Sequence, residues 1–351
     1  MNQEQITKLE LSIENMKNKK SRIYLIAQDT KGNAKASIAY IYRLALSLLN
    51  AGYNPIILHE TPDYTGVSEW LGEEYMLIPH KSIEGQNLEV SPEDLIVIPE
   101  LYGFVMSQVN NLPCGKIVLC QSYDYMLETL QPGQSWSDLG FLKCITTSNK
   151  QKEHIENVMR NVSFDILAPY ISDNFKPQKF PAKPIITVHS RDQRDTVNLI
   201  KSFYIKFPQY RWITFRDMRN LTEKEFSAGL EESCLSVWID ELSAYGTYPL
   251  ESMKSGVPVL GLVPNLIPEW MSEENGLWIN NKIQLVDFIA DYLQNWLEDN
   301  VNEELFIGMK KTVDSLPTKE SFEDESVKLF DKYLTSRQES FTEQLSKLQT
   351  I

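Results

Sequence analysis

Apolar and polar positions along the chain form alternating blocks that predict strands and helices in turn. Residues 22–27 are an apolar run of strand length, and the segment after them carries apolar residues every three or four positions until Gly52. A second strand is expected at 55–59. A strand, a helix and a second strand within roughly forty residues form a βαβ unit, so the sequence predicts a parallel sheet.

The same alternation continues to the end of the chain. The other elements of the first half are expected at 3–18, 94–99, 116–120, 144–147, 148–159 and 164–168. Those of the second half are expected at 184–189, in a helix ending at 207, and at 211–215, 222–232, 234–239, 285–297, 306–313 and from 320 onward. The sequence therefore predicts an α/β fold with two doubly wound domains, which place a ligand cleft at the carboxyl ends of their strands.

A polar, proline-rich stretch at about 172–184 separates the two series of elements. We therefore expect Rossmann-like domains at 1–172 and 185–320, joined by a linker at 173–184. Residues 321–351 are expected to form a C-terminal helix that could pack back on the first domain.

Composition and charge exclude several classes of protein. The formal net charge is −14 and the pI is about 4.9, which argues against nucleic acid as a partner because phosphate backbones are bound by basic surfaces. No apolar run reaches the ~18 residues that span a bilayer, and the first residues lack the basic and apolar regions of a secretion signal. The four cysteines form no C-x-x-C pair, so we expect reduced core residues in a cytoplasmic protein.

A small basic cluster stands apart from this acidic composition. Lys17, Lys19, Lys20 and Arg22 lie close together near the N-terminus, where they could contact anionic lipid headgroups at a membrane surface. The alternative is the solvated end of a helix.

Residues 245–260 are the most informative segment of the chain. Gly246 allows a tight turn close to a ligand, Pro249 suits the first position of a helix, and Gly256 suits the position just past its end. Residues 257–263 then have the length and composition of a strand buried on both faces. A helix that begins after a glycine loop presents free N–H groups and its positive dipole end, which favours phosphate.

This segment also resembles a known family. Gly246 to Val259 is similar to the "G-x-x-P-L-E-A-M-x-x-G-x-P-V" segment of retaining GT-B glycosyltransferases, specifically the large glycosyltransferase family 4. Residues 267–269 resemble the family's "I-P-E", and residues 274–279 resemble its "x-N-G-L-L-V". The resemblance implies a GT-B architecture, in which two Rossmann-like domains face a central cleft.

The resemblance implies roles for two arginines. The family's "G-R-x-x-x-x-K" segment holds the diphosphate of the donor; Arg191 matches its arginine, and Arg194 takes the role of its lysine if the loop is two residues shorter. Two cations at a strand end can offset the charge that develops on a departing diphosphate. The alternative is a surface loop in which both arginines pair with Asp192 and Asp195.

Two functional glutamates of the family correspond to positions 251 and 243 of this sequence. Glu251 matches the one that binds the ribose hydroxyls, and we expect it at the third helical position, where the helix dipole alone would also stabilise it. The second family glutamate corresponds to Ser243, and Glu241 could take its role in a longer loop. The expected donor-binding set is completed by Gly246, Thr247, Tyr248 and Leu250, of which the first three would present backbone N–H groups.

The first domain offers weaker candidates. Gly32 and Asn33 resemble the family's glycine loop after the first strand, which closes over the reaction centre. Family members often have a histidine or an acid near the donor sugar, for which Asp124 and Glu100 are the candidates here, although polar residues at strand ends are common. Trp136, in a loop-like stretch, is the tryptophan that we expect to meet an acceptor.

The four histidines lack metal-ligand spacing, so we expect no catalytic metal and no other cofactor. The resemblance implies a retaining enzyme that moves a hexosyl group from a nucleotide-diphosphate sugar to a glycan or a lipid-linked saccharide. A catalytically silent GT-B protein that binds glycan or supports a partner enzyme is the second hypothesis. A sugar-nucleotide epimerase is the third, although no convincing acid–base pair is present. A nicotinamide dehydrogenase is disfavoured because no G-x-G-x-x-G follows either opening strand.

Overall fold

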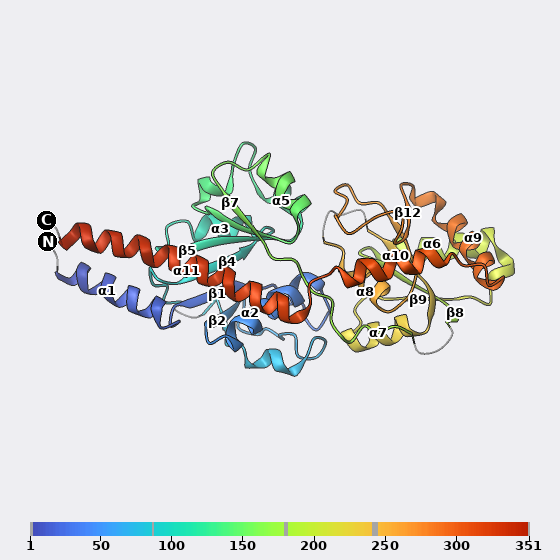
Figure 1. Cartoon of the computed structure of the whole chain (residues 1–351), viewed down its shortest axis with the longest axis horizontal. Coiled ribbons are helices and arrows are strands. Elements are labelled where there is room, and N and C mark those ends of the chain that lie inside the picture. Colours follow the sequence, from blue (N-terminus) through green and yellow to red (C-terminus); the bar gives the residue numbers. More distant parts are fainter. Residues whose placement is uncertain (1–2, 86–87, 179–181, 241–244, 350–351) are drawn as a thin grey trace. The chain divides into compact units, whose positions relative to one another are not determined.

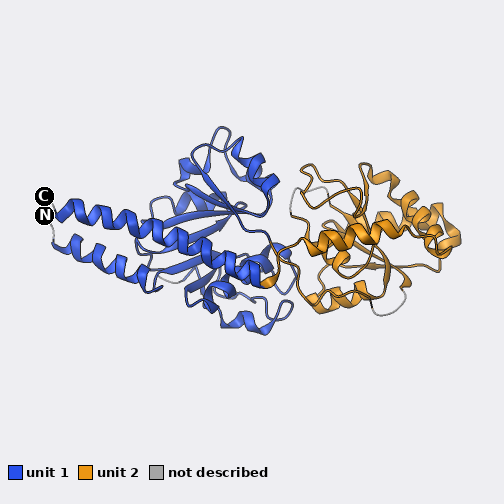
Figure 2. Ribbon diagram, in the orientation of Figure 1, with its two compact units in different colours: residues 1–168, 320–351 blue, residues 169–319 orange. Residues whose placement is uncertain are grey.

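The structure is a computed structural model that describes residues 3–85, 88–178, 182–240 and 245–349. The chain divides into two compact units (Figure 2). Unit 1 comprises residues 1–168 and 320–351, and unit 2 comprises residues 169–319. Each unit is an α/β structure with its own sheet (Figure 1).

The described part of unit 1 contains a seven-stranded parallel sheet in the order β3-β2-β1-β4-β5-β6-β7. Its strands are β1 (Arg22–Ile26), β2 (Asn54–His59), β3 (His80–Ser82), β4 (Leu95–Pro99), β5 (Gly115–Cys120), β6 (Lys143–Thr146) and β7 (Ser163–Ile166). The prediction missed only β3 among these, because three residues are too few to show a pattern. The strand order reverses between β1 and β4, and ligands of doubly wound sheets bind at such a switch point.

The described part of unit 1 also contains helices before, between and after these strands. They are α1 (Gln3–Lys17), α2 (Ala36–Asn50), α3 (Gly103–Gln108), α4 (Tyr123–Thr129), α5 (Asn149–Glu156) and α11 (Lys319–Gln349). Ser148 caps α5 as predicted, since its hydroxyl accepts a hydrogen bond from the Gln151 N–H. The helices α3 and α4 were not predicted; each has only six or seven residues.

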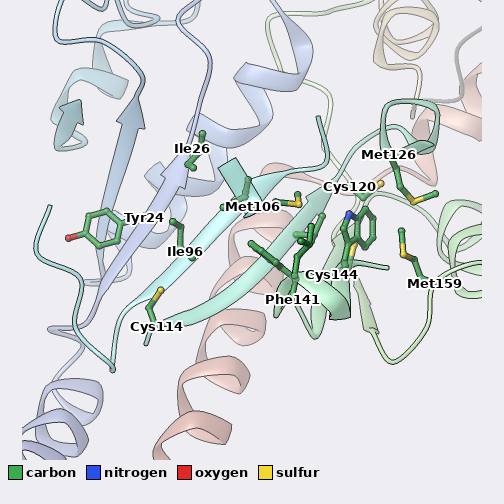
Figure 3. Close-up of a cluster of buried hydrophobic side chains, with 14 of the residues drawn as sticks. Tyr24, Ile26, Ile96, Met106, Cys114, Cys120, Met126, Phe141, Cys144 and Met159 are labelled. Carbon is green, nitrogen blue, oxygen red and sulfur yellow. The ribbon is translucent and has the colours of Figure 1, made fainter. Parts of the chain in front are cut away.

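The core on one face of unit 1 is rich in sulfur and aromatic side chains. Cys120 and Cys144 lie on the neighbouring strands β5 and β6 among Met126, Phe141 and Met159 (Figure 3). All four cysteines of the chain are free and buried, which confirms the prediction of core cysteines. The prediction for Trp136 was wrong: it begins a short 3₁₀ turn and is fully buried in this core, because its large ring contributes more when removed from water.

The last helix of the chain, α11, runs along unit 1 (Figure 1). Its Tyr333 hydroxyl donates to Asp165 at 3.0 Å, and its Arg337 Nε donates to the Pro92 carbonyl at 2.7 Å. Its Phe322 ring lies 5.6 Å from the Tyr40 ring of α2 in an edge-on contact. The C-terminal residues are therefore part of the first unit's core.

Two of the four basic residues near the N-terminus are bound to the protein itself. Arg22 pairs with Asp94 at 2.8 Å. Lys19 donates to the Ala51 carbonyl at 3.2 Å and lies over the Tyr53 ring. Contact with a membrane surface stays a prediction. Within the described ranges, no helix combines the length and the apolar character needed to cross a membrane.

The described part of unit 2 contains a five-stranded parallel sheet in the order β12-β11-β10-β8-β9. Its elements are β8 (Lys183–Ser190), α6 (Gln193–Lys206), β9 (Thr214–Asp217), α7 (Glu223–Glu231), β10 (Ser233–Ile239), α8 (Thr247–Lys254), β11 (Val259–Leu262), β12 (Leu277–Ile279), α9 (Leu285–Leu297) and α10 (Glu303–Asp314). The strand expected at 211–215 begins three residues later, because residues 208–210 form a 3₁₀ turn. The switch point of this sheet lies between β8 and β10.

Candidate functional site

The switch point of unit 2 carries a partly exposed ion pair. Arg191 follows β8 and Asp240 follows the neighbouring β10, so the sheet brings the two residues together at its carboxyl edge. The Nε of Arg191 donates to an Asp240 oxygen at 2.7 Å, and the side chains are 42% and 13% exposed. Asp240 therefore fixes a partly exposed guanidinium at the position where such sheets bind ligands.

Arg194 has a different environment from Arg191. It lies in the first turn of α6, and its guanidinium pairs with Asp192, the residue that caps the same helix, at 2.6 Å. The Arg194 side chain is 86% exposed. This is the pairing that the surface-loop alternative expects, so binding a diphosphate would require Arg194 to leave Asp192.

A third arginine and a histidine also lie at this edge, and the sequence analysis gave neither a role. Arg219 follows β9 and is held by Asp217 through bonds of 3.0 and 3.1 Å. The ring of His189, near the end of β8, lies 4.4 Å from the Tyr248 ring in a tilted contact. Burial lowers the pKa of His189 to about 4, against the effect of Asp217 and with that of Arg191 and Arg219, so the ring is neutral at pH 7. The sequence signal that could have found these two residues is their position, because Arg219 follows a strand and His189 lies at the end of one.

The three sequence blocks that carry the family resemblance pack together. Gly246 has a φ of +76°, and a Cβ there would lie 2.9 Å from the Trp270 ring, so no larger residue fits. The Trp270 indole donates to the Tyr245 carbonyl at 2.6 Å, and the Trp270 carbonyl accepts from Asn275. Trp278 packs edge-on against Trp270. The glycine loop is therefore shaped by Trp270, which follows the second block, and by Trp238 of β10, which would lie 3.5 Å from the same Cβ.

The start of α8 corrects two predictions. The helix begins at Thr247, so Pro249 occupies the third position rather than the first, and Glu251 the fifth rather than the third. The left-handed Gly246 already turns the chain into the helix, and proline is tolerated at the third position because its nitrogen needs no intrahelical partner there. Gly256 follows the capping residue at the end of α8 with a φ of +74°, which confirms its predicted place.

The side chains after Gly246 point into the unit. Tyr248 is 5% exposed and its hydroxyl oxygen accepts from Ser236 at 2.9 Å, while Leu250 is fully buried. Only the backbone of these two residues can serve a ligand, as expected for Tyr248. Glu251 is half-buried. Glu241 and Ser243 lie outside the described residues.

The glycine loop of unit 1 lies at the carboxyl end of β1, at the switch point of its sheet. Gly32 has a φ of +79°, and a Cβ there would lie 3.2 Å from the Glu69 carboxylate. The Asn33 side chain donates to the Thr30 carbonyl at 3.0 Å. Both residues thus shape the loop that the resemblance places over the reaction centre.

The two acidic candidates of unit 1 lie on adjacent strand ends. Glu100 follows β4 and is only 2% exposed; one of its oxygens accepts from the Ser122 N–H at 2.8 Å. Burial raises the pKa of Glu100 to about 7. Asp124 lies half-buried in the first turn of α4, two residues beyond Ser122.

No group of three or more histidine, cysteine, aspartate or glutamate side chains among the described residues is arranged to hold a metal ion. Independence from metal therefore stays a prediction.

Comparisons with known proteins address the fold. No family model matches the sequence. An α-1,6-glucosyltransferase of Actinobacillus pleuropneumoniae serotype 7 (strain AP76) is 20% identical over 221 residues, which are 58% of this chain and 67% of the relative. Sucrose-phosphate synthase from Thermosynechococcus elongatus superposes with a TM-score of 0.65 at 14% identity, covering 90% of this chain and 100% of the other.

The Anabaena protein HepE, in complex with UDP-glucose, superposes with a TM-score of 0.61 at 10% identity, covering 89% of this chain and 99% of the other. The fold is that of the GT-B glycosyltransferases. The predicted α/β class and the expected GT-B relationship are confirmed. In the GT-B fold of this chain, Arg191 and the glycine loop share the switch point of unit 2.

Proposed function

We propose that the protein is a glycosyltransferase that moves a hexosyl group from a nucleotide-diphosphate sugar to a glycan or lipid-linked saccharide acceptor. We further propose that the transfer retains the configuration of the anomeric carbon and needs no metal ion. The observation that carries this proposal is Arg191 at the switch point of unit 2, next in the fold to the glycine loop that opens α8. UDP-glucose, present in the HepE complex, is the donor to try first.

The donor diphosphate would find two kinds of hydrogen-bond donor at this edge. The N–H groups of Thr247 and Tyr248 lie in the first turn of α8, where they have no intrahelical partner and add the positive end of the helix dipole. Arg191 supplies a full positive charge. Both stabilise the negative charge that builds on the diphosphate as the bond to the sugar breaks.

In the proposed reaction the acceptor hydroxyl attacks the anomeric carbon on the face that the diphosphate leaves. The bond between the anomeric carbon and the phosphate oxygen breaks, the new glycosidic bond forms, and the hydroxyl proton passes to an oxygen of the departing diphosphate. No side chain has to act as a base, so the protein contributes positioning and charge stabilisation. Glu251 is proposed to bind the ribose hydroxyls, and Glu241 and Asp124 to face the donor sugar.

Calorimetric titration with UDP tests the site. Arg191→Ala should weaken UDP binding about 10- to 100-fold, because a hydrogen bond to a charged group contributes ~1.5–3 kcal/mol. Arg194→Ala should change it by less than about threefold, since that exposed side chain is already paired. Arg211→Ala is the matched control, an exposed arginine at the opposite end of β9. Equal affinity for wild type and Arg191→Ala would contradict the proposed site.

Turnover is tested separately with UDP-glucose and a set of saccharide acceptors. Proton NMR of the product should show the same anomeric configuration as the donor, and EDTA should leave the rate unchanged. UDP binding without any turnover would instead support the catalytically silent alternative.

A further inference from the structure

The switch point of unit 1 is rich in acidic side chains. Four acidic side chains lie at the carboxyl ends of β1, β2 and β4 or in the loops that follow these strands; we call Asp29, Glu60, Glu69 and Glu100 the acidic edge. The connection at 60–79 contains five carboxylates and no lysine or arginine. Lys31 is the one base in the loop at 27–33, and it lies 3.7 Å from Asp29.

The neighbouring strands β2, β1 and β4 bring these acids to one edge of the sheet. The Glu69 carboxylate lies against Gly32, in the loop that Asp29 begins. Burial, and then the carboxylates of Glu60 and Glu100, raise the pKa of Tyr102. Glu100 is only partly ionised at pH 7, but Asp29, Glu60 and Glu69 concentrate negative charge at the acidic edge, which would repel a phosphate or a carboxylate.

A stack of aromatic rings lies beside the acids. The Tyr64 ring stacks on His59 at 4.2 Å, and His59 stacks on His80 at 5.4 Å. Burial lowers the pKa of His59 to about 4 and also lowers that of His80, so the stack is uncharged at pH 7. Asp29 lies close enough to His59 to oppose this shift. Tyr64 is only half-buried and so presents part of its ring at the edge.

Two buried polar side chains at the same strand ends have capacity to bind a ligand. Thr30, 5% exposed in the loop after β1, has a hydroxyl without a hydrogen-bond partner among the described residues. Glu100, 2% exposed, has one such carboxylate oxygen. Buried polar atoms are usually partnered, so unpartnered ones at the carboxyl ends of two neighbouring strands point to a ligand rich in hydroxyl groups.

We propose that the acidic edge and the Tyr64 ring bind an uncharged sugar of the acceptor, and that they reject acceptors bearing phosphate or carboxylate groups. Carboxylate oxygens accept strong hydrogen bonds from sugar hydroxyls. The aromatic face packs against the apolar side of a sugar ring. This inference rests on the proposed glycosyltransferase function and names its acceptor class.

The test measures sugar binding directly, without turnover. Saturation-transfer NMR on the full chain uses a neutral set, maltose, cellobiose and N,N′-diacetylchitobiose, against digalacturonic acid as the anionic probe. We expect at least one neutral disaccharide to bind at least tenfold more tightly than digalacturonic acid. Equal binding of the anionic probe, or no binding of the whole neutral set, would overturn the inference.

A charge reversal sharpens the test. Glu69→Lys, at an exposed position, should weaken the best neutral disaccharide about tenfold and remove most of the discrimination against digalacturonic acid. Glu10→Lys, on the exposed side of α1, makes the same charge change away from the acidic edge and should leave both affinities unchanged. An unchanged ratio in Glu69→Lys would overturn the inference.

UDP titration of the same samples separates the two proposals. If UDP binds but the neutral sugars do not, the acceptor inference alone fails. If UDP does not bind, the proposed function fails.

Discussion

The two sheets of this protein share a doubly wound plan but differ in the chemistry of their carboxyl edges. In unit 2, Arg191, Arg194 and Arg219 lie at the edge, each held by an aspartate. In unit 1, the acidic edge lies beside an uncharged aromatic stack. One fold thus supplies the positions, and the residues placed after each strand decide whether the edge suits an anion or a neutral polyol.

The largest effect is expected from Trp136, a tryptophan in the core of unit 1. Because it is fully buried, Trp136→Ala should destabilise unit 1 by about 3–5 kcal/mol. Urea denaturation followed by circular dichroism measures the loss. Trp212→Ala is the control, since Trp212 is 50% exposed and should cost less than about 0.5 kcal/mol. Similar stabilities of the two variants would contradict a core role for Trp136.

The pH dependence of stability tests the protonation state of Glu100 in unit 1. Its pKa is about 7 in the folded unit and 4.5 without burial, so the stability that the protonated acid provides is complete below pH 4.5 and is lost as the pH rises through about 7. Glu100→Gln cannot ionise and should be more stable than the wild type above pH 7, by up to about 3 kcal/mol. Unfolding free energies measured from pH 4 to 9 should converge at the acid end. Parallel curves would show that Glu100 ionises normally.

A substitution at Gly246 makes the smallest chemical change at the carboxyl edge of unit 2. Gly246→Ala puts a Cβ at positive φ and against Trp270, so we expect a loss of about 1–3 kcal/mol and at least about tenfold weaker UDP binding. Gly52→Ala, at a φ of +83° with open space around the added Cβ, imposes the backbone strain without the clash. Equal UDP affinity in both variants would show that the shape of the Gly246 loop does not matter for the nucleotide.

Regular patterns of apolar residues over long segments made most of the helices and strands predictable from the sequence. Burial on both faces gives β4 a continuous apolar run, and Gly256 marks the end of α8. Short elements escaped because β3 or α3 offers too few residues for a period to appear. The start of α8 was misplaced because Pro249 is allowed at more than one position of a first turn.

The site was predictable where it depends on local chain geometry, as at Gly246, and less so where it depends on pairing across strands. The bond between Arg191 and Asp240 joins residues 49 positions apart, and the register of β8 and β10 decides it. No sequence motif identifies His189. Its neutral state results from burial, which arises only when unit 2 is folded. The aromatic stack of Tyr64, His59 and His80 likewise arises from tertiary packing.

The place of α11 has a consequence for how the chain emerges during synthesis. Unit 2 is one continuous stretch, whereas unit 1 is completed only by residues 320–351, which are made after unit 2. Until then the partners of the buried Phe322, Phe330 and Tyr333 remain uncovered. Although unit 1 starts before unit 2 along the chain, it is therefore the unit that finishes folding second, and a chain that ends at residue 319 would contain a complete unit 2 and an incomplete unit 1.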